Sequence, residues 1–576
     1  MERSTILILL VTFCFLSNAQ SPSYKQIPAT FQGKHHMLSP DELLKENFNL
    51  KNFEATDPPP GLVRSIAEFE PNQGVIIRAG TYYGQIYFGI TYHFIATMSE
   101  HVIVYVICKD SEEEDLVTTA FLNADVNINN VEFVYAPSDG FWTRDYSPWF
   151  IEYDDKSVGI VNFPYNRPRP ADDSIPGVMG EYFDMEVFGM PLIHTGGNYM
   201  TDGMGVAASC DLVYEENSDL SAQEIAELAE NFLGINNYYL VNDPLDSYIQ
   251  HIDCWGKFLA PDKILITEVP YDDPRYDDFE AMADFWANQI SSYGNKYKVY
   301  RTYSPNGQPF SNSLILNNRV YVPIISDEAP QYNEDALLVY QEAMPGYEII
   351  GVEEHSYFSW QSSDALHCRT SQVTDFEMLR IVHYPFLDSI NFEDSYMFEA
   401  EVYSLSSTQN MEEEVYLYYQ INGSEFQQVE MNNISETNYA VEILEFTNED
   451  SVCYYIQATN NNNKTEKHPY IGEYSPHCFI IIDDEVGSVK ISDNTYIKAF
   501  PNPVYDRLTI TANDLPNDNY LLQIIDNKGR ILKEKNLEVQ NSWIMLRVDM
   551  SGFEQGLYFV RIIGNNNSFS ERFIKL

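Results

Sequence analysis

The spacing of apolar residues indicates an α/β domain between residues 61 and 376. Three short apolar runs predict buried strands: 74–78, 102–107 and 263–267. Two intervening stretches, 221–233 and 278–293, repeat apolar residues at helical spacing. The first of them begins with Ser221 and Glu224 at the positions of a capping box. Strands that alternate with helices are typical of an α/β fold.

Beyond about residue 377 the helical spacing is replaced by alternation of apolar and polar residues, which is typical of strands. In 377–485 the runs 414–419 and 453–457 alternate in this way, and Asn-rich turns separate them. Their size and pattern predict an immunoglobulin-like β-sandwich. The segment 490–576 is also predicted to be all-β, with strands near 507–511, 520–525, 544–548 and 557–563.

Residues 1–19 have the features of a signal peptide. Arg3 supplies a positive charge, the stretch 6–16 is apolar apart from one Thr, and small residues predict cleavage after Ala19. A polar lead-in, 20–60, follows and ends in three prolines. No later segment holds about eighteen uninterrupted apolar residues, so we expect no transmembrane span.

Composition narrows the class of protein and of partner. Hydrophobic residues make up 44% of the chain, which is too much for a disordered protein. Acidic residues outnumber basic ones 86 to 34, giving a net charge of −52, so we expect no nucleic-acid partner. Such a surface attracts cationic ligands, for example arginine-containing peptides or proteins. The alternative is that the charge only keeps an exported protein soluble.

Seven cysteines are present, and Cys14 lies within the predicted signal peptide. The others are widely scattered and form no C-x-x-C pair, which argues against a zinc site or a disulfide scaffold. Cys453 and Cys478 could pair within one β-domain, and the sequence leaves that pairing open. We expect no metal and no cofactor in the chemistry, and leave open only a structural cation.

Four polar motifs in the α/β region fit one reaction together: 142–149 (WTRDYSPW), 194–199 (HTGGNY), 251–254 (HIDC) and 364–370 (DALHCRT). A guanidinium is planar and cationic, so two carboxylates can hold it through paired charge-assisted hydrogen bonds. A thiolate can then attack its central carbon. A histidine can protonate the leaving ammonia and then deprotonate the incoming water. Positioning alone can contribute about 7–11 kcal/mol to such a reaction.

The H-x-D spacing of His251 and Asp253 suits the same chemistry. We expect this segment to be a strand, on which residues i and i+2 project into one pocket. Each motif alone also has a structural interpretation: a core cysteine, a structural H-x-D, or a buried ion pair beside a tryptophan. The functional interpretation is favoured because all the motifs occur in order within one domain.

In this order the motifs resemble the guanidine-modifying superfamily, and most closely the secreted bacterial peptidylarginine deiminases of its agmatine deiminase-like branch. The resemblance covers about residues 60–376 and implies the pentein fold, in which five ββαβ units form a propeller around a central pocket. It implies a role for each of six residues: guanidinium clamp for Asp145 and Asp253, general acid and base for His251, nucleophile for Cys368, and lining of the substrate's aliphatic stem for Trp142 and Tyr248.

Two features bear on the substrate. Agmatine deiminases usually show W-M-R-D-T-G-P and a glycine-rich approach to H-C, whereas this chain has WTRDYSP and SSDALHC. Arg167 and Arg169 stand where two arginines of the bacterial peptidylarginine deiminases bind the carboxylate of a C-terminal arginine, a group that agmatine lacks. The alternative is that both arginines lie in a solvent-exposed, polyproline-like loop. The resemblance implies no calcium dependence, and we expect the acidic run 111–115 to be a helix N-terminus.

The end of the chain carries a second resemblance. The segment 498–504 contains a P-N-P turn, 556–561 reads GLYFVR, and the terminus is basic. Together these features resemble the type A sorting domain of the type IX secretion system of Bacteroidota. The resemblance implies the type IX machinery as a partner, removal of the tail, and a secreted or cell-surface location. The β-sandwich would serve as a support or spacer.

The leading hypothesis is hydrolysis of peptidyl arginine, preferably C-terminal, to citrulline and ammonia. The alternative enzyme activity is deimination of a free small guanidine such as agmatine. A third hypothesis is a non-catalytic surface-binding module with a decayed pentein domain, and the presence of every catalytic residue type argues against it.

Overall fold

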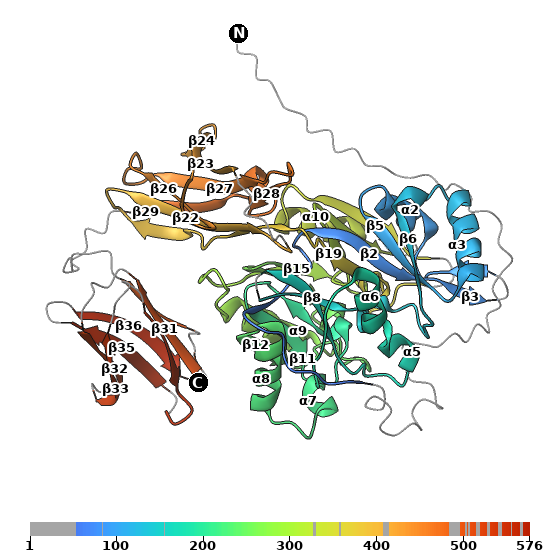
Figure 1. Cartoon of the computed structure of the whole chain (residues 1–576), viewed down its shortest axis with the longest axis horizontal. Helices are drawn as coiled ribbons and strands as arrows, with labels where there is room; N and C mark the ends of the chain where they lie inside the picture. The colour runs from blue at the N-terminus through green and yellow to red at the C-terminus, as the bar shows by residue number, and fades with distance from the viewer. Residues whose placement is uncertain are drawn as a thin grey trace, which may run out of the picture. The chain divides into compact units, whose positions relative to one another are not determined.

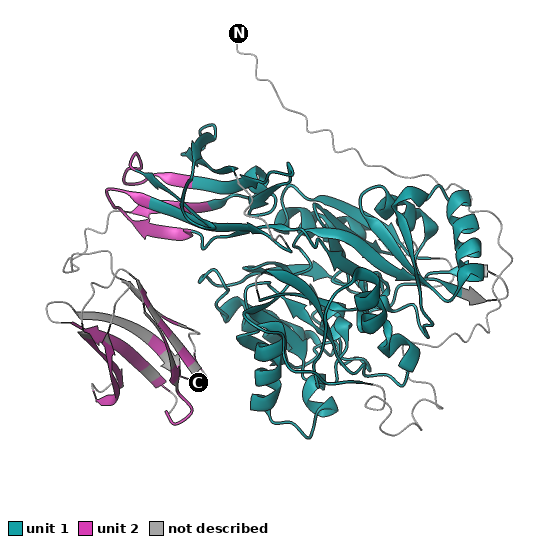
Figure 2. Ribbon diagram, viewed as in Figure 1, with its two compact units in different colours: residues 1–385, 397–443, 453–477 teal, residues 386–396, 444–452, 478–576 magenta. Residues whose placement is uncertain are grey.

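The computed structural model describes residues 53–575 apart from gaps at 83–84, 155, 326–329, 356–358, 407–413, 483–495, 501–503, 505–506, 514–518, 527–529, 539–543, 554–555 and 565–567. The predicted signal peptide, and the lead-in up to residue 52, lie outside the described residues. The chain divides into two compact units (Figure 2): unit 1 comprises residues 1–385, 397–443 and 453–477, and unit 2 comprises 386–396, 444–452 and 478–576. Within the described ranges, no helix is both long and apolar enough to cross a membrane.

Residues 63–374 of unit 1 form five small sheets, and each sheet contains an antiparallel pair extended by a parallel strand (Figure 1). In hydrogen-bonded order they are β19 (Ser371–Thr374), β2 (Asn72–Arg78), β5 (Ile103–Cys108) and β6 (Val131–Tyr135); β1 (Val63–Ser65), β7 (Trp149–Tyr153), β8 (Ser157–Asn162) and β9 (Val187–Gly189); β10 (Met200–Thr201), β11 (Val206–Cys210) and β12 (Asn237–Val241); β13 (Gly256–Ala260), β14 (Lys263–Glu268) and β15 (Lys298–Tyr303); and β16 (Leu314–Leu316), β17 (Arg319–Ile324) and β18 (Glu348–Glu353).

Helices connect the parallel strands of each sheet, as a parallel connection requires. They are α2 (Tyr92–Ser99), α3 (Ser111–Asn123), α5 (Pro170–Asp173), α6 (Ile175–Phe183), α7 (Leu212–Glu216), α8 (Ala222–Leu233), α9 (Tyr276–Asn288) and α10 (Pro330–Ala343). A short hairpin, β3 (Gly80–Tyr82) and β4 (Gln85–Tyr87), stands apart from the five sheets. The α/β architecture predicted for 61–376 is therefore confirmed.

The local predictions for this region hold in most places. The three predicted strands are β2, β5 and β14, and Ile264 to Ile266 in β14 are fully buried. A strand covered on both faces requires such a continuous apolar run. The capping box also forms, because the Ser221 N–H donates to Glu224 Oε2 over 2.7 Å and the Glu224 N–H donates to Ser221 Oγ over 3.3 Å. The acidic run 111–115 begins helix α3, as predicted.

The helix predicted for 278–293 differs in both bounds, because α9 spans Tyr276–Asn288. Gln289 is already extended, and a turn follows in which the Ser291 hydroxyl donates to Asn295 over 2.5 Å. Serine and asparagine side chains that bond locally compete with the helix, which explains the earlier end.

The part of unit 1 beyond residue 377 is built mainly from β-strands, as the alternation of apolar and polar residues predicted. One sheet has the order β20-β22-β26-β25, and in the other β27 lies beside β23 and β28. Their bounds are β20 (Leu379–Val382), β22 (Tyr396–Ser404), β23 (Glu414–Ile421), β24 (Gln427–Glu430), β25 (Asn432–Ser435), β26 (Asn438–Ile443), β27 (Ser451–Thr459) and β28 (Thr465–His468).

Unit 2 is also built from strands. Its C-terminal part forms two sheets, in the orders β30-β31-β34 and β33-β32-β35-β36, around a core that includes Leu508, Ile524, Val560 and Phe573. The strands are β21 (Asp388–Asn391), β29 (His477–Ile482), β30 (Tyr496–Phe500), β31 (Arg507–Asn513), β32 (Asn519–Asp526), β33 (Ile531–Glu538), β34 (Ile544–Asp549), β35 (Gly556–Ile563) and β36 (Ser568–Lys575). Four of them coincide with the strands predicted in 490–576.

Candidate active site

Cys368 lies at the centre of a short 3-10 helix, η4 (His367–Arg369), and its side chain is fully buried. The following residue anchors this turn. The Arg369 guanidinium donates two hydrogen bonds of 2.9 Å to the Asp364 carboxylate and one of 2.6 Å to the Gly89 carbonyl. Because a bidentate pair restricts a guanidinium strongly, the backbone that carries Cys368 is held firmly in place.

Asn312 contacts both the backbone and the thiol of Cys368. Its Oδ1 accepts hydrogen bonds from the backbone N–H groups of His367 (2.9 Å) and Cys368 (3.3 Å), and its Nδ2 lies 3.3 Å from Cys368 Sγ. Asn312 was not predicted from the sequence. The one local signal is its place in a polar Ser-Asn-Ser run directly before the buried strand β16.

The segment 251–254 is not the strand that its H-x-D spacing predicted. Residues Ile252–Cys254 form a 3-10 helix, η3, and His251 is the extended residue that precedes it. Backbone N–H groups here bond three residues back along the chain, so the segment joins no sheet ladder. The turn places Asp253 Oδ2 2.6 Å from His367 Nδ1 and 3.8 Å from Cys368 Sγ. A tight turn, and not strand alternation, therefore positions the predicted acid–base and clamp residues.

Asp145 and His251 lie together although 106 positions separate them in the sequence, and Gly197 makes this contact possible. His251 Nδ1 lies 3.5 Å from Asp145 Oδ1, and both side chains are buried. A Cβ atom at Gly197 would lie 2.5 Å from His251 Nδ1 and 2.8 Å from Asp145 Oδ1. The H-T-G-G-N motif thus provides the space in which the predicted clamp and base meet.

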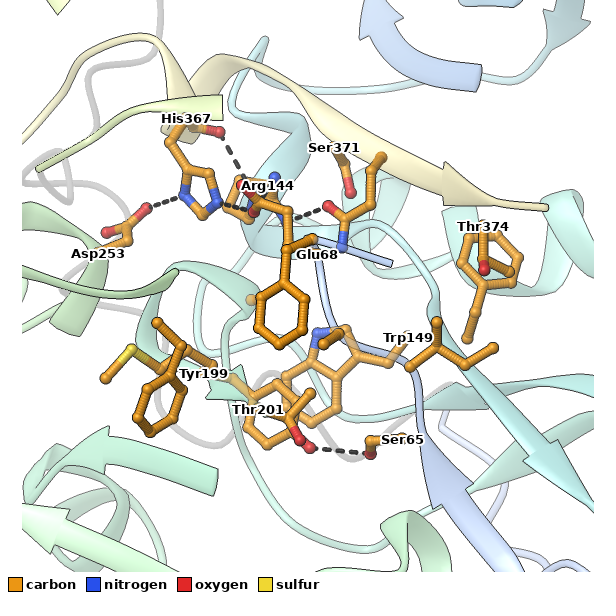
Figure 3. A pocket seen from close by; sticks show the side chains of 18 of the residues that line it. Ser65, Glu68, Arg144, Trp149, Tyr199, Thr201, Asp253, His367, Ser371 and Thr374 are labelled. Atoms are coloured by element: carbon orange, nitrogen blue, oxygen red, sulfur yellow. Dashed lines mark hydrogen bonds and ion pairs between the residues drawn. The ribbon is translucent and has the colours of Figure 1, made fainter. Parts of the chain in front are cut away.

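A buried ionic network lies beside Asp253 and His367 (Figure 3). Glu68 Oε2 lies 2.5 Å from His367 Nε2, and the Glu68 carboxylate also pairs with two cations. These are Lys257 Nζ at 2.9 Å and Arg144 Nη2 at 3.2 Å. Burial would raise the pKa of Glu68, but these positive charges lower it well below its usual range. Neither Glu68 nor Lys257 was predicted from the sequence.

The pKa of Asp253 is also set by this network. Burial raises it, but the hydrogen bond and charge of His367 outweigh burial, so that the pKa lies below its usual range. Asp253 is therefore negatively charged at neutral pH, as a guanidinium clamp requires.

The same side chains line a cavity of about 70 Å³. Such a volume holds a few water molecules and is too small for a peptide. Its lining includes Asp253, His367, Glu68 and Lys257 but not Cys368.

The environment of the Cys368 thiol disfavours the thiolate. A hydrogen bond with Cys254 lowers the pKa of Cys368, but burial and the charges of Asp253, Asp364 and Asp145 raise it, and the pKa lies above its usual value. In the free protein the thiol is thus protonated at neutral pH. A cation bound beside it would favour the reactive thiolate.

Cysteine pairing in the described part of the chain is simple. Cys453 and Cys478 are disulfide-bonded. The thiols of four others are free and buried: Cys108, Cys210, Cys254 and Cys368.

Arg167 and Arg169 are buried, with 8% and 1% of their surface exposed. The exposed-loop alternative for these two residues is therefore wrong. The Arg169 guanidinium lies 5.4 Å from the centroid of the Trp142 ring, and Trp142 packs in one apolar cluster with Cys368. The structure thus brings the Arg169 side chain to the vicinity of the predicted nucleophile.

Two carboxyl groups with raised pKa accompany these arginines. Burial raises the pKa of Glu216 to about 7, although the charge of Arg167 opposes it. Burial likewise raises the pKa of Asp172 to about 7, against the charge of Arg169. Carboxyl groups with such pKa values are only partly ionised at neutral pH.

Tyr248 is partly exposed, with 48% of its surface accessible. Burial of its hydroxyl and the charges of Asp364, Cys254 and Cys368 raise its pKa. The residue therefore lies near Cys368 and reaches the surface, as a residue at the entrance of the site would.

The comparisons with known proteins agree with these motifs. Residues 84–373 match the Porphyromonas-type peptidyl-arginine deiminase family, and residues 498–576 match the secretion system C-terminal sorting domain. A provisionally named agmatine deiminase of Legionella pneumophila (strain Paris) is 26% identical over 268 residues, covering 42% of this chain and 75% of that protein. One of Shewanella baltica (strain OS223) is 24% identical over 287 residues, covering 42% and 76%.

Similar solved structures were also found. One is a provisionally named arginine deiminase from Porphyromonas gingivalis, with a TM-score of 0.47, 19% identity, and coverage of 54% of this chain and 98% of that one. Another is the agmatine deiminase of Enterococcus faecalis, with a TM-score of 0.47, 18% identity, and coverage of 54% and 95%.

The family's chemistry is the hydrolytic deimination of guanidines. The C-terminal sorting domain directs export through the type IX machinery to the cell surface or the medium. On the extent of the match over residues 84–373, this chain belongs to the Porphyromonas-type peptidyl-arginine deiminase family and carries a type IX secretion sorting domain.

Proposed function

We propose that this protein hydrolyses the guanidinium of peptidyl arginine, preferably at a C-terminus, to citrulline and ammonia. The observation that carries the proposal is the buried pair Arg167 and Arg169, of which Arg169 lies against Trp142. Two buried guanidinium groups suit an anionic group of a ligand, and a C-terminal arginine carries both a carboxylate and a guanidinium.

In the proposed reaction Asp145 and Asp253 hold the guanidinium by its N–H edges. The Cys368 thiolate attacks the central carbon and forms a C–S bond, one C–N bond breaks, and His251 protonates the departing ammonia. Water, deprotonated by His251, then attacks the thiouronium carbon, the C–S bond breaks, and the thiolate is regenerated. One water is consumed for each ammonia and each ureido group formed.

The substrate itself would activate the nucleophile. In the free protein the pKa of Cys368 is raised, chiefly by burial and by neighbouring carboxylates. A guanidinium between Asp145 and Asp253 would place a positive charge beside the thiol and lower its pKa. This coupling would restrict the reactive thiolate to the complex with a cationic substrate.

We also propose that the five sheets of residues 63–374 are the five units of a pentein propeller. The same order of antiparallel pair and parallel strand in each sheet supports this arrangement. We further propose that the two sheets after residue 377 form an immunoglobulin-like sandwich that supports the deiminase domain.

Agmatine is the alternative substrate, and the names of the curated relatives favour it. The same two aspartates would hold its guanidinium, but agmatine has no carboxylate to neutralise Arg167 and Arg169. The two substrates therefore make different demands on this pair of residues.

The test is formation of a ureido product and ammonia from three substrates: a peptide with C-terminal arginine, a peptide with internal arginine, and agmatine. We expect the wild type to prefer the first, and Cys368→Ala to produce no ureido product from any. Arg167→Ala and Arg169→Ala should each lower kcat/KM for the C-terminal substrate about 10–100-fold, the value of a charge-assisted hydrogen bond of about 1.5–3 kcal/mol.

Two controls make the result specific. Arg319→Ala removes an arginine that pairs with the surface-exposed side chain of Glu348. This variant should leave turnover unchanged. A preference of the wild type for agmatine, unaffected by the Arg167 and Arg169 variants, would establish the alternative. Absence of ureido product from all three substrates with wild type would favour the binding-module hypothesis.

A further inference from the structure

Two thiols and a carboxylate meet at the candidate active site. Within the described ranges, Asp253, Cys254 and Cys368 form the group whose sulfur and oxygen atoms all lie within 4.8 Å of one another, and all three residues are buried. Cys254 belongs to η3 and Cys368 to η4, so two separate turns of the chain create the cluster. The proposed deimination uses one thiol only, and Cys254 has no part in it.

Each sulfur in this cluster lies near one oxygen of the Asp253 carboxylate, at a separation close to that of two ligands on one metal ion. Cys254 Sγ lies 3.5 Å from Asp253 Oδ1, and Cys368 Sγ lies 3.8 Å from Asp253 Oδ2. A tetrahedral ion with sulfur at about 2.3 Å and oxygen at about 2.1 Å holds its sulfur and oxygen ligands about 3.6 Å apart. The three side chains therefore require little movement to bind a single ion.

We propose that Asp253, Cys254 and Cys368 form a binding site for a soft divalent cation such as Zn²⁺ or Cd²⁺, and that the ion inhibits the enzyme. Two thiolates select soft and borderline metals over Mg²⁺ and Ca²⁺. Binding releases the two thiol protons to solvent and forms two metal–sulfur bonds and one metal–oxygen bond. The nucleophile and one arm of the guanidinium clamp are then both occupied.

The surroundings suit such an ion. Two thiolates and one carboxylate carry three negative charges, and the ion supplies two positive ones. His367 Nδ1 lies 2.6 Å from Asp253 Oδ2 and holds that carboxylate in place. Because the proposed mechanism needs no metal, the ion would act as a reversible inhibitor and not as a cofactor.

The test is titration of the protein, with its free thiols reduced and the Cys453–Cys478 disulfide intact, with Cd²⁺, read by the ultraviolet charge-transfer absorption of cadmium–thiolate bonds. We expect one tightly bound ion in wild type and in the control Cys108→Ala, which removes a buried thiol elsewhere, on β5. Cys254→Ala and Cys368→Ala should each weaken binding by more than about 100-fold, because even ligand-supporting residues are worth about 10–100-fold.

Inhibition provides the second measurement. Zn²⁺ should inhibit citrulline formation by wild type with equimolar stoichiometry, and a chelator should restore the rate. Cys254→Ala, measured against its own uninhibited rate, should require more than about 100-fold more Zn²⁺. Cys254→Ser, which keeps the side-chain size, should show the same loss of metal affinity if Cys254→Ala proves unstable.

Two results would overturn the inference: unchanged Cd²⁺ affinity in the folded Cys254 variants, or equal loss of affinity in Cys108→Ala. The absorption measurement does not depend on turnover. A cadmium–thiolate signal without citrulline formation would therefore support the metal site and contradict the proposed function.

Discussion

Two environments of buried histidines in unit 1, one around His367 and one formed by a group of three rings, show how a neighbouring charge changes the effect of burial. His367 lies between two carboxylates, 2.6 Å from Asp253 and 2.5 Å from Glu68. The second group is His383, His468 and His477, whose rings lie 5.1 to 6.0 Å apart between centroids. Among the residues that the structure describes, no carboxylate is hydrogen-bonded to these rings. The hydrogen bonds of this group go to tyrosine hydroxyls, to a backbone carbonyl and from ring to ring.

The electrostatic results differ accordingly. Burial lowers the pKa of His383 to about 4 and that of His468 to about 3, and it holds the pKa of His477 well below its usual value. Around His367, by contrast, the carboxyl groups of Asp253 and Glu68 have pKa values below the usual range despite their burial. Burial alone thus favours neutral side chains, and ion pairing at close range is what keeps the active-site network charged.

Removing the central anion should have the largest effect. Glu68→Gln leaves Lys257, Arg144 and His367 without their shared counter-charge, and we expect it to lower the free energy of unfolding by about 3–5 kcal/mol. Chemical denaturation followed by tryptophan fluorescence would measure the loss. Glu348→Gln, at an exposed ion pair with Arg319, is the matched control and should cost less than about 1 kcal/mol. Equal losses in the two variants would show that burial of the pair makes no difference.

Replacing the bridging histidine should affect catalysis next most strongly. His367→Ala frees the Asp253 carboxylate to rotate, and we expect kcat to fall about 100-fold, the usual cost of a misplacement of about 1 Å. His367→Asn keeps an N–H donor near the position of Nδ1 and should recover part of the rate. A change in KM alone, or no recovery in the asparagine variant, would contradict a positioning role for His367.

The second group predicts how stability changes with pH. Its folded pKa values lie below the ordinary 6.5, so the unfolded chain binds more protons between about pH 6.5 and pH 4. The melting temperature should therefore fall as pH decreases through that window. Asp253 and Glu68, with lowered pKa values, contribute stability above about pH 4 that is lost only at lower pH.

A variant of this group tests the assignment. The groups that face these histidines are Tyr293, Tyr454, Lys263, Arg380 and the Glu399 carbonyl. His477→Gln removes one titrating ring and should flatten the melting temperature between pH 6.5 and pH 4. A profile as steep as that of wild type would locate the acid sensitivity elsewhere.

The smallest expected effect is the loss of one neutral hydrogen bond. The Tyr293 hydroxyl lies 3.3 Å from His468 Nε2, and Tyr293→Phe should lower the free energy of unfolding by about 1 kcal/mol. Denaturation at pH 7 would measure it. A loss above about 3 kcal/mol would mean that this neutral hydrogen bond stabilises the fold as much as the ion pairs around Glu68 are expected to.

The secondary structure was predictable where it depends on neighbouring residues. The buried runs became β2 and β14, and Ser221 and Glu224 form their capping box, because burial pattern and capping act over one or two turns. The errors arose where side chains override the pattern. Local hydrogen bonds end α9 early, and the 251–254 segment closes into a 3-10 turn.

The residue types of the candidate site were also readable from the chain. Guanidine chemistry demands two carboxylates, a histidine and a thiol, and the motifs supply Asp145, Asp253, His251 and Cys368 in an order that one family shares. The roles of these residues were implied by the resemblance to that family, so no contact had to be known in advance.

Contacts between distant parts of the chain could not be foreseen in this way. His367 joins Asp253 and Glu68, which lie 114 and 299 positions away in the sequence, and Asn312 reaches Cys368 across 56 positions. Local propensity and periodicity carry no information about such pairings, because they extend over a few residues only. The chain thus specified which chemical groups are present, whereas folding determined which of them touch. Those contacts set the charge of the proposed clamp residue Asp253 and bring Cys254 and Cys368 together.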